Sequence, residues 1–282
     1  MYQIIARWLR LAFPTYIIVF YTLSMFIYTG DGPAFYEVVE HNIIEPLREY
    51  WWTIILFIQN VKPWEGFQGI YWISFVANDL QFYILIMMPS IYLYLSTKRA
   101  VVLSYLIALI ALSIVYVFYV SALNDFSSIL TIKDNLMFNE LYRRPFGPMG
   151  YYALGILLSL FYFEYQQAIS NRDLRTRKAY RFLSYIGRSK KRQYTLQTIG
   201  ALVMVFVLFI RFTSFQDSDG VKGRWGVLLN SLFNCLAGHL FTWGLVLVFL
   251  PIFIGRLTII RDIFASSFFR PFARVSFTAM LI

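Results

Sequence analysis

The sequence predicts an all-α, polytopic integral membrane protein, and two observations carry this prediction. Hydrophobic residues make up 59% of the 282 residues and charged residues only 14%, whereas soluble domains carry about 25% charged residues. Several apolar runs also reach about 18 residues or more, which is long enough for a helix to cross a bilayer. Together these features exclude a soluble globular protein.

Six full spans and the start of a seventh are expected along the chain. The six spans cover residues 9–29, 71–95, 100–121, 149–165, 195–212 and 226–254, and the last one begins near residue 275. The segment at 49–61, "EYWWTIILFIQNV", is too short to span, and its two tryptophans suit an interfacial or re-entrant segment. We interpret residues 1–282 as one domain that is incomplete at both ends, because about eight apolar residues follow Arg274.

The basic residues predict the orientation of the spans. Of the 25 Lys and Arg residues, 17 fall on the side that holds the N-terminus and the 166–193 loop, while the opposite loops carry most of the acidic residues. The positive-inside rule therefore predicts a cytoplasmic, or equivalent, location for the N-terminus and this loop. Orientation explains the net charge of +10 better than nucleic-acid binding does.

The basic 166–193 loop itself has two interpretations. Its cations could face anionic lipid headgroups, or they could receive a polyanionic ligand such as a coenzyme A thioester, whose phosphates bind Arg and Lys. The single cysteine, Cys235, excludes an intramolecular disulfide and a multi-cysteine metal site. We predict no metal and no resident cofactor.

Polar residues inside the second span are the first candidates for a functional site. Asp79 lies in a long apolar run with Asn78 and Gln81 beside it, and such a carboxylate is costly without a partner or a function. Tyr83 lies four residues later and shares its helical face, while Trp72 lies two turns earlier. Asp79 therefore either lines a polar pocket or pairs with an arginine across the bundle.

Four further residues carry polar side chains where a membrane protein seldom places them. Arg7 and Arg10 are neighbours on one helical face where the first span begins, so they either share an anion or extend to lipid headgroups. Arg144 follows another arginine on the external side, where Asp79 is a candidate partner. His239 lies inside the sixth span, as a proton-transfer group or as a hydrogen-bonding residue.

Four segments in order resemble the membrane acyltransferases of family 3, especially their nose-resistant-to-fluoxetine branch. These segments are "ARWLRLAFPTY", then "WWTIILFIQNV" with "WISFVANDLQFYILIMMP", then "YRRPFGPMGYYALGILLS", and finally "FFRPFARVSFTAMLI". The resemblance implies transfer of an acyl group from acyl-CoA to a carbohydrate or lipid acceptor across the membrane. It also implies a catalytic histidine in a span upstream of the R-x-x-R segment, and this chain begins six residues before Arg7.

The resemblance also assigns roles to residues. It implies catalytic roles for Asp79, Gln81 and Arg144, and substrate-binding roles for Arg7, Arg10, Asn78, Tyr83 and His239. Membrane lipids and acyl-CoA are the expected partners. The alternative is an inactive scaffold or lipid-binding subunit of a larger membrane complex, and a transporter or channel is a third possibility that the absence of evident repeats disfavours.

Overall fold

The computed structural model describes residues 2–63, 73–128, 135–176, 178–211, 225–254, 266–268 and 271, and in these ranges the chain forms helices and turns without a strand. This confirms the all-α prediction. The longer helices are α1 (Tyr2–Ser24), α3 (Glu45–Ile55), α4 (Ile73–Phe82), α5 (Met88–Ser96), α6 (Arg99–Leu123), α8 (Met149–Ser170), α9 (Lys178–Gly187), α10 (Lys190–Ile210) and α11 (Val227–Phe253). The shorter elements are η1 (Phe26–Tyr28), α2 (Pro33–Val39), η2 (Glu40–Ile44), η3 (Tyr83–Met87), α7 (Asn135–Phe138), η4 (Asn139–Arg143) and η5 (Arg172–Thr176).

Five of the described helical segments are long and apolar enough to cross a membrane. They are Ile4–Ser24, Ile73–Ser96, Arg99–Leu123, Lys190–Ile210 and Val227–Phe253. The expected span at 149–165 does form a helix, α8, but it is not among the five, because four tyrosines and Glu164 lower its hydropathy. The structure thus gives five of the six expected spans, and the expected start of a seventh near residue 275 lies outside the described residues.

The span Ile73–Ser96 is one continuous helical run with an interruption in its middle. Helix α4 passes into the π-helical turn η3 and then into α5, and Pro89 lies in the first turn of α5. A π-helical turn takes in one residue more than an α-helical turn and often marks a functional site. Asp79 lies one turn before this interruption.

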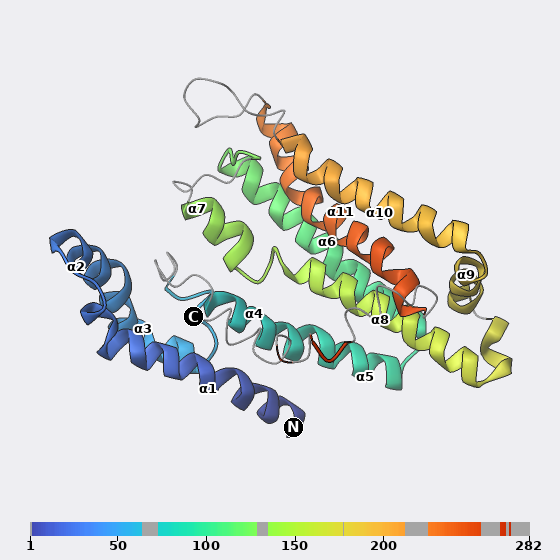
Figure 1. The fold of residues 1–282 in the computed structure, drawn as a ribbon, viewed down its shortest axis with the longest axis horizontal. Helices are drawn as coiled ribbons and strands as arrows, with labels where there is room; N and C mark the ends of the chain where they lie inside the picture. The colour runs from blue at the N-terminus through green and yellow to red at the C-terminus, as the bar shows by residue number, and fades with distance from the viewer. Residues whose placement is uncertain are drawn as a thin grey trace.

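Helices α6, α8, α10 and α11 form a packed bundle, and α4 with α5 lies beside it (Figure 1). Within the bundle α10 and α11 approach closely at two glycines: a Cβ added to Gly200 would lie 2.6 Å from the carbonyl oxygen of Gly244. Small residues allow such approach between membrane helices. Helix α1 packs against α4 from the other side, with α2 and α3 next to it.

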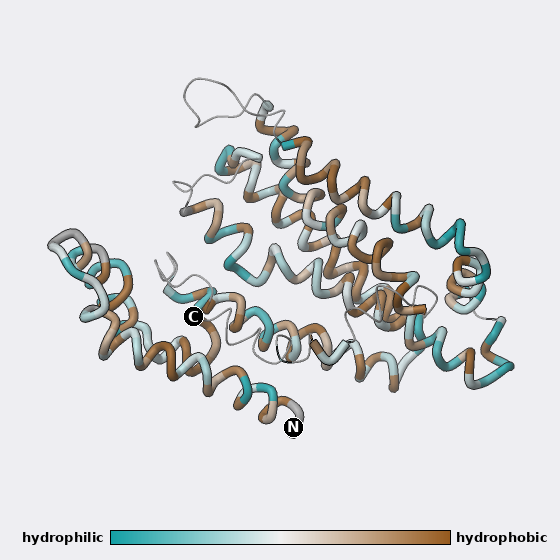
Figure 2. The backbone as a smooth tube through the Cα atoms, viewed as in Figure 1, coloured by the Kyte–Doolittle hydropathy of each residue, from teal (hydrophilic) through white to brown (hydrophobic). Residues whose placement is uncertain are grey.

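The N-terminus, the end of α5 and α9 lie toward the same end of the molecule (Figure 1). The expected loop at 166–193 is largely helical there, since it contains the end of α8, η5, α9 and the start of α10. Figure 2 shows hydrophilic residues concentrated where α8 ends and α10 begins. The segment at 49–61 contains only the second half of α3 followed by a turn, so it is too short to span, as predicted.

Candidate functional site

The carboxylate of Asp79 pairs with Arg7 on the facing helix. The Arg7 Nη2 atom lies 2.7 Å from Asp79 Oδ1 and 2.8 Å from Oδ2, and Nε lies 3.3 Å from Oδ2. The two side chains are 25% and 37% exposed. The pair is therefore firmly hydrogen-bonded and still open on one side, so a ligand can reach both charges.

Apolar contacts hold α1 and α4 together around this ion pair. Residues of α1, of α4 and of the turn that follows α3 form one buried cluster: Leu11, Ala12, Phe57, Val76, Ala77 and Leu80. Trp8 packs against this cluster, and its ring forms a T-shaped pair with the ring of Phe57. The register of the two helices is thus fixed by packing, and this register brings Arg7 level with Asp79.

Two tyrosines border the ion pair. The Arg7 guanidinium lies over the ring of Tyr83, 4.6 Å from its centroid, a position that favours a cation–π interaction. Tyr152 of α8 lies within electrostatic reach of Arg7, Asp79 and Tyr83. Its ring packs against Phe82 with centroids 5.3 Å apart, so the site joins α1, α4 and α8.

A groove of about 870 Å³ runs between α5 and α8 and begins at Tyr152. Besides Tyr152 it is lined mainly by apolar and aromatic side chains, among them Met87 and Ile91 of the second span and Ile156 and Phe163 of α8. Ligand sites in proteins usually have volumes of about 300 to 1,000 Å³ and few polar groups. The groove has the size and the lining of such a site.

Side-chain amides next to Asp79 form a closed hydrogen-bond cluster. Asn60 donates to Asn78 (2.6 Å) and to Gln81 (2.8 Å), and Gln81 donates to Asn60 and to the carbonyl of Phe57, both at 2.8 Å. Phe57 has a positive φ of 54°, which is strained for a bulky residue. Gln81 and Asn78 thus hold the turn after α3 against α4, and their side-chain amides are engaged in these hydrogen bonds.

Arg143 and Arg144 are buried and belong to a different set of contacts. Arg143 is fully buried, it donates to the carbonyls of Gln59 (3.4 Å) and Pro63 (3.3 Å), and its own carbonyl accepts a hydrogen bond from Asn78 (3.0 Å). Arg144 pairs with Glu140 at 2.8 Å, with side chains 6% and 11% exposed. Asp79 was the candidate partner for this arginine pair, and that interpretation is wrong because Arg7 occupies the carboxylate.

His239 lies in the middle of α11, at the junction with α6 and α8. It is 5% exposed, and neither ring nitrogen has a hydrogen-bond partner among the described residues. The ring of Tyr151 packs edge-on against it at 4.7 Å, and a Cβ at Gly150 would lie 2.6 Å from its Nε2 atom. The structure does not bring His239 to the Asp79 site.

Arg10, the other arginine of the first helix, is exposed and makes no hydrogen bond or ion pair within the described ranges. Arg7 and Arg10 therefore do not share a protein anion. Trp72, expected on the same stripe as Asp79, lies outside the described residues. Of the predicted site residues, the structure gathers Arg7, Asp79 and Tyr83 directly and places Asn78 and Gln81 behind them.

Several buried polar residues make contacts that the sequence interpretation did not predict, and four of them are Asn60, Arg143, Glu140 and Glu164. Asn60 belongs to the amide cluster and Arg143 to the packing beside it, while Glu140 pairs with Arg144. Glu164 of α8 is the fourth, and its Oε1 atom lies 2.7 Å from Arg99 Nε. Each stands in or beside an apolar run, which is the signal that identified Asp79 and that applies equally to them.

Comparison with known proteins finds a distant relative. Over 162 residues the chain is 27% identical to Nose resistant to fluoxetine protein 6 of Caenorhabditis elegans, a match that covers 54% of this chain and 19% of that protein. The matched region therefore spans about a fifth of the relative's length. No protein-family model and no solved structure matches the chain. The match supports, at a distance, the resemblance seen in the four segments.

Proposed function

We propose that this chain forms the body of a membrane acyltransferase, with the acyl-transfer site at Arg7 and Asp79. The observation that carries the proposal is a bidentate ion pair, 25% and 37% exposed, within electrostatic reach of Tyr152, which lines the apolar groove. This combination suits a ligand with a hydrocarbon tail and a reactive polar end. The four resembling segments and the distant relative support the same reaction class.

The groove between α5 and α8 would hold the acyl chain. Its lining offers Met87, Ile91, Ile156 and Phe163 to a hydrocarbon, and a bound acyl chain would gain van der Waals contacts with these side chains. Tyr152, at the end nearest to Arg7, would mark the position of the acyl carbonyl. The donor would be a thioester such as acyl-CoA.

Arg7 and Asp79 would act on the reacting groups. In acyl transfer the acceptor's hydroxyl oxygen bonds to the acyl carbon, the bond to the thioester sulfur breaks, and the hydroxyl proton ends on the released thiol. A guanidinium stabilises the negative charge that develops on the carbonyl oxygen during this step. Arg7 would supply this charge, and Asp79 would orient Arg7 and accept a hydrogen bond from the acceptor's hydroxyl.

The orientation of the donor follows from the charge distribution. Basic residues concentrate at the end of the molecule that carries α9 and the N-terminus, and we propose that this end faces the cytoplasm. A cytosolic acyl-CoA would then approach from the end at which α5 and α8 also meet the basic segment. Gln81 and Asn78 would position the site through the amide cluster without contacting the substrate.

Photolabelling and transfer assays test the proposal together. Purified protein in nanodiscs is incubated with a palmitoyl-CoA analogue that carries a diazirine in its acyl chain, and labelled peptides are identified by mass spectrometry. Label is expected on the peptide of the second span that contains Met87, at the end of η3, and on the peptide of α8 that contains Tyr152. Radiolabelled acetyl-CoA and palmitoyl-CoA then measure transfer to lipid and carbohydrate acceptors.

The variant Asp79→Asn is expected to lower transfer about 100-fold, the usual cost of losing one electrostatic contributor to the transition state. Labelling of the groove should persist, because the hydrocarbon contacts remain. Glu40→Gln is the matched control, since it removes an ion pair of similar length with Arg48 on the surface of η2 and α3. Label outside the groove, or equal transfer by Asp79→Asn and Glu40→Gln, would contradict the proposal.

A further inference from the structure

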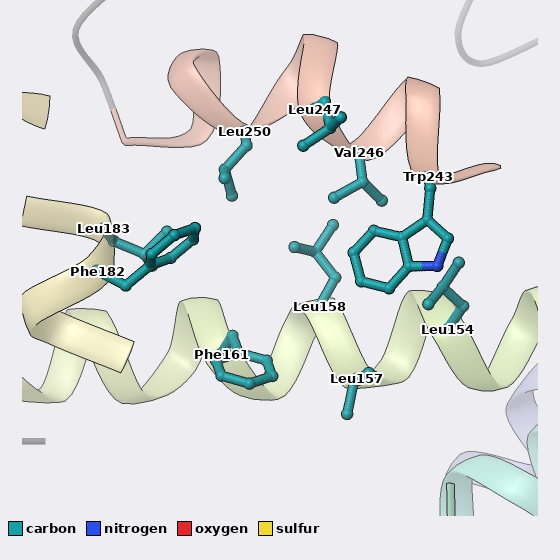
Figure 3. A pocket seen from close by; sticks show the side chains of 10 residues that line it. All are labelled: Leu154, Leu157, Leu158, Phe161, Phe182, Leu183, Trp243, Val246, Leu247 and Leu250. Carbon is teal, nitrogen blue, oxygen red and sulfur yellow. The ribbon is translucent and has the colours of Figure 1, made fainter. Parts of the chain in front are cut away.

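A second cavity lies at the opposite face of α8, between α8, α9 and α11. It has a volume of about 240 Å³, and all ten side chains that line it are hydrophobic (Figure 3). Leu158 and Phe161 come from α8, Phe182 and Leu183 from α9, and Trp243 and Leu247 from α11. A ligand part that enters this cavity must therefore be hydrocarbon.

The cavity opens to the outside of the helical bundle. Trp243 is 46% exposed and Phe182 is 57% exposed, although both line the cavity. Helix α11 is one of the five segments that can cross a membrane, so its exposed side chains face lipid. An acyl chain in the surrounding leaflet can enter the cavity from the side.

Helix α9 places positive charge at the mouth of this cavity. Between Lys178 and Arg192 the sequence contains six basic residues and no acidic residue. Lys178 lies four residues before Phe182 and three before Arg181, so it shares a face of α9 with each of them, and Phe182 lines the cavity from this face. Both cationic side chains are exposed.

The exposed aromatics of α9 indicate how the helix meets the membrane. Phe182 and Tyr185 lie three residues apart and are 57% and 61% exposed, while Ala179, Leu183 and Ile186 are buried against the bundle. A short helix with exposed aromatics beside Lys and Arg is typical of the membrane interface. With α9 at the membrane interface, its cationic side chains would lie at the level of the lipid phosphates and the cavity at the level of the acyl chains.

We propose that this site binds an anionic phospholipid, with one acyl chain in the cavity and the phosphate held by Lys178 and Arg181. The volume is smaller than the usual range of about 300 to 1,000 Å³ for whole ligands, so it suits part of one chain. A neutral lipid could fill the cavity, but it would gain nothing from the uncompensated charge of α9. This site is separate from the acyl-transfer groove and does not depend on it.

Native mass spectrometry tests the site directly. Delipidated protein in detergent is titrated with dioleoyl phosphatidylglycerol or with dioleoyl phosphatidylcholine. We expect one molecule of the anionic lipid to bind at least tenfold more tightly than the neutral lipid. Equal affinity for the two lipids would overturn the proposal.

Two kinds of variant separate the cavity from the charge. Leu158→Trp fills the cavity and should abolish the first binding event, and Leu247→Phe is a milder filling should the tryptophan variant fail to fold. Leu202→Trp is the control, since Leu202 is 62% exposed on α10 and lines no part of the cavity. The double variant Lys178→Gln/Arg181→Gln should lower affinity for the anionic lipid to that for the neutral one.

The double variant Arg48→Gln/Lys62→Gln makes the same change in net charge far along the chain and should bind lipid as the wild type does. Loss of binding on charge removal with no effect of either cavity-filling variant would show adsorption to the surface of α9 and overturn the proposal. Loss in both control variants as well would show a non-specific effect, and this result would overturn it too.

Discussion

Two ion pairs of almost equal length occupy very different surroundings in this molecule. Arg7 and Asp79 meet at 2.7 Å with a quarter or more of each side chain exposed, whereas Arg144 and Glu140 meet at 2.8 Å with side chains only 6% and 11% exposed. A buried pair cannot lose one member without leaving an uncompensated charge. An open pair tolerates such a loss, because solvent or a ligand can replace the missing member.

The comparison separates structural charge from charge that is available for chemistry. The buried pair of Arg144 and Glu140 (the closed pair) also receives a hydrogen bond from Tyr116 of α6, whose hydroxyl lies 3.1 Å from Glu140 Oε2. It therefore ties η4 to α6 and shapes the entry to α8. The open pair ties α1 to α4 and still presents its charges. Distance alone does not distinguish the two, and exposure does.

The largest expected effect comes from breaking the closed pair. Glu140→Ala leaves Arg144 buried without its carboxylate, so the free energy of unfolding should fall by about 3–5 kcal/mol. Tryptophan fluorescence during denaturant unfolding in detergent measures it. The double variant Glu140→Ala/Arg144→Met removes both charges and should recover part of the loss. A double variant less stable than Glu140→Ala would contradict this view of the pair.

In a third ion pair only the carboxylate is buried, and removal of either partner should cause an intermediate loss of stability. Glu164 is 2% exposed and its partner Arg99 is 38% exposed. Glu164→Gln lets Arg99 turn to solvent and should cost about 1–3 kcal/mol, whereas Arg99→Gln strands a buried carboxylate and should cost more. The same unfolding measurement compares them. Equal costs would show that burial does not govern these pairs.

A smaller change in stability is expected at the open pair. Asp79→Ala should lower the free energy of unfolding by about 0–1 kcal/mol, as is usual for exposed ion pairs. Acyl transfer should nevertheless fall strongly, because the reacting charges lie there. Paired measurements of stability and transfer on one protein preparation check this. A loss of stability as large as that of Glu140→Ala would remove the distinction between the two pairs.

The smallest effect concerns a fully exposed pair on η2 and α3. The hydrogen bond from His41 Nδ1 to Glu45 Oε2 (2.9 Å), together with the charge of Glu45, raises the pKa of His41 above 6.5. The stabilisation is therefore fully present below pH 6.5 and is lost as the pH rises through the raised pKa. NMR titration should place the His41 midpoint above 6.5, and Glu45→Gln should return it toward 6.5. An unchanged midpoint in that variant would exclude Glu45 as the cause.

Much of the fold follows from hydropathy, because the cost of burying polar backbone in lipid imposes helices of a fixed minimum length. The helical character of every expected span in the described ranges is confirmed. Two helices begin earlier than the expected spans at 9–29 and 195–212. Helix α1 begins before Arg7, and α10 begins at Lys190. Charged residues near the ends of a membrane helix extend toward water without ending the helix.

The candidate site was predictable in its residues and unpredictable in its pairing. Asp79 stood out because a carboxylate in an apolar run needs a partner. Which arginine it meets depends on the register of α1 against α4, and this register is set by packing between residues about 70 positions apart. The pairing of Glu140 with Arg144 was equally unpredictable, because Glu140 lies in the π-helical turn η4 and Arg144 has an extended backbone, so the i,i+4 rule of an α-helix does not apply.

The π-helical turn η3 determines how the span Ile73–Ser96 would respond to the loss of one residue. One residue beyond the α-helical repeat is accommodated between Asp79 and the groove residues of α5. Deletion of a single exposed residue there, such as Leu85 at 64% exposure, would let the turn close as a regular α-helical turn, and the two halves would keep nearly the same relative rotation because the π-helical turn already absorbs the extra residue. The carboxylate and the hydrocarbon groove would keep their faces and approach each other by about one α-helical residue rise of 1.5 Å, so relatives that align with a one-residue gap at this position would still aim the acid in the same direction.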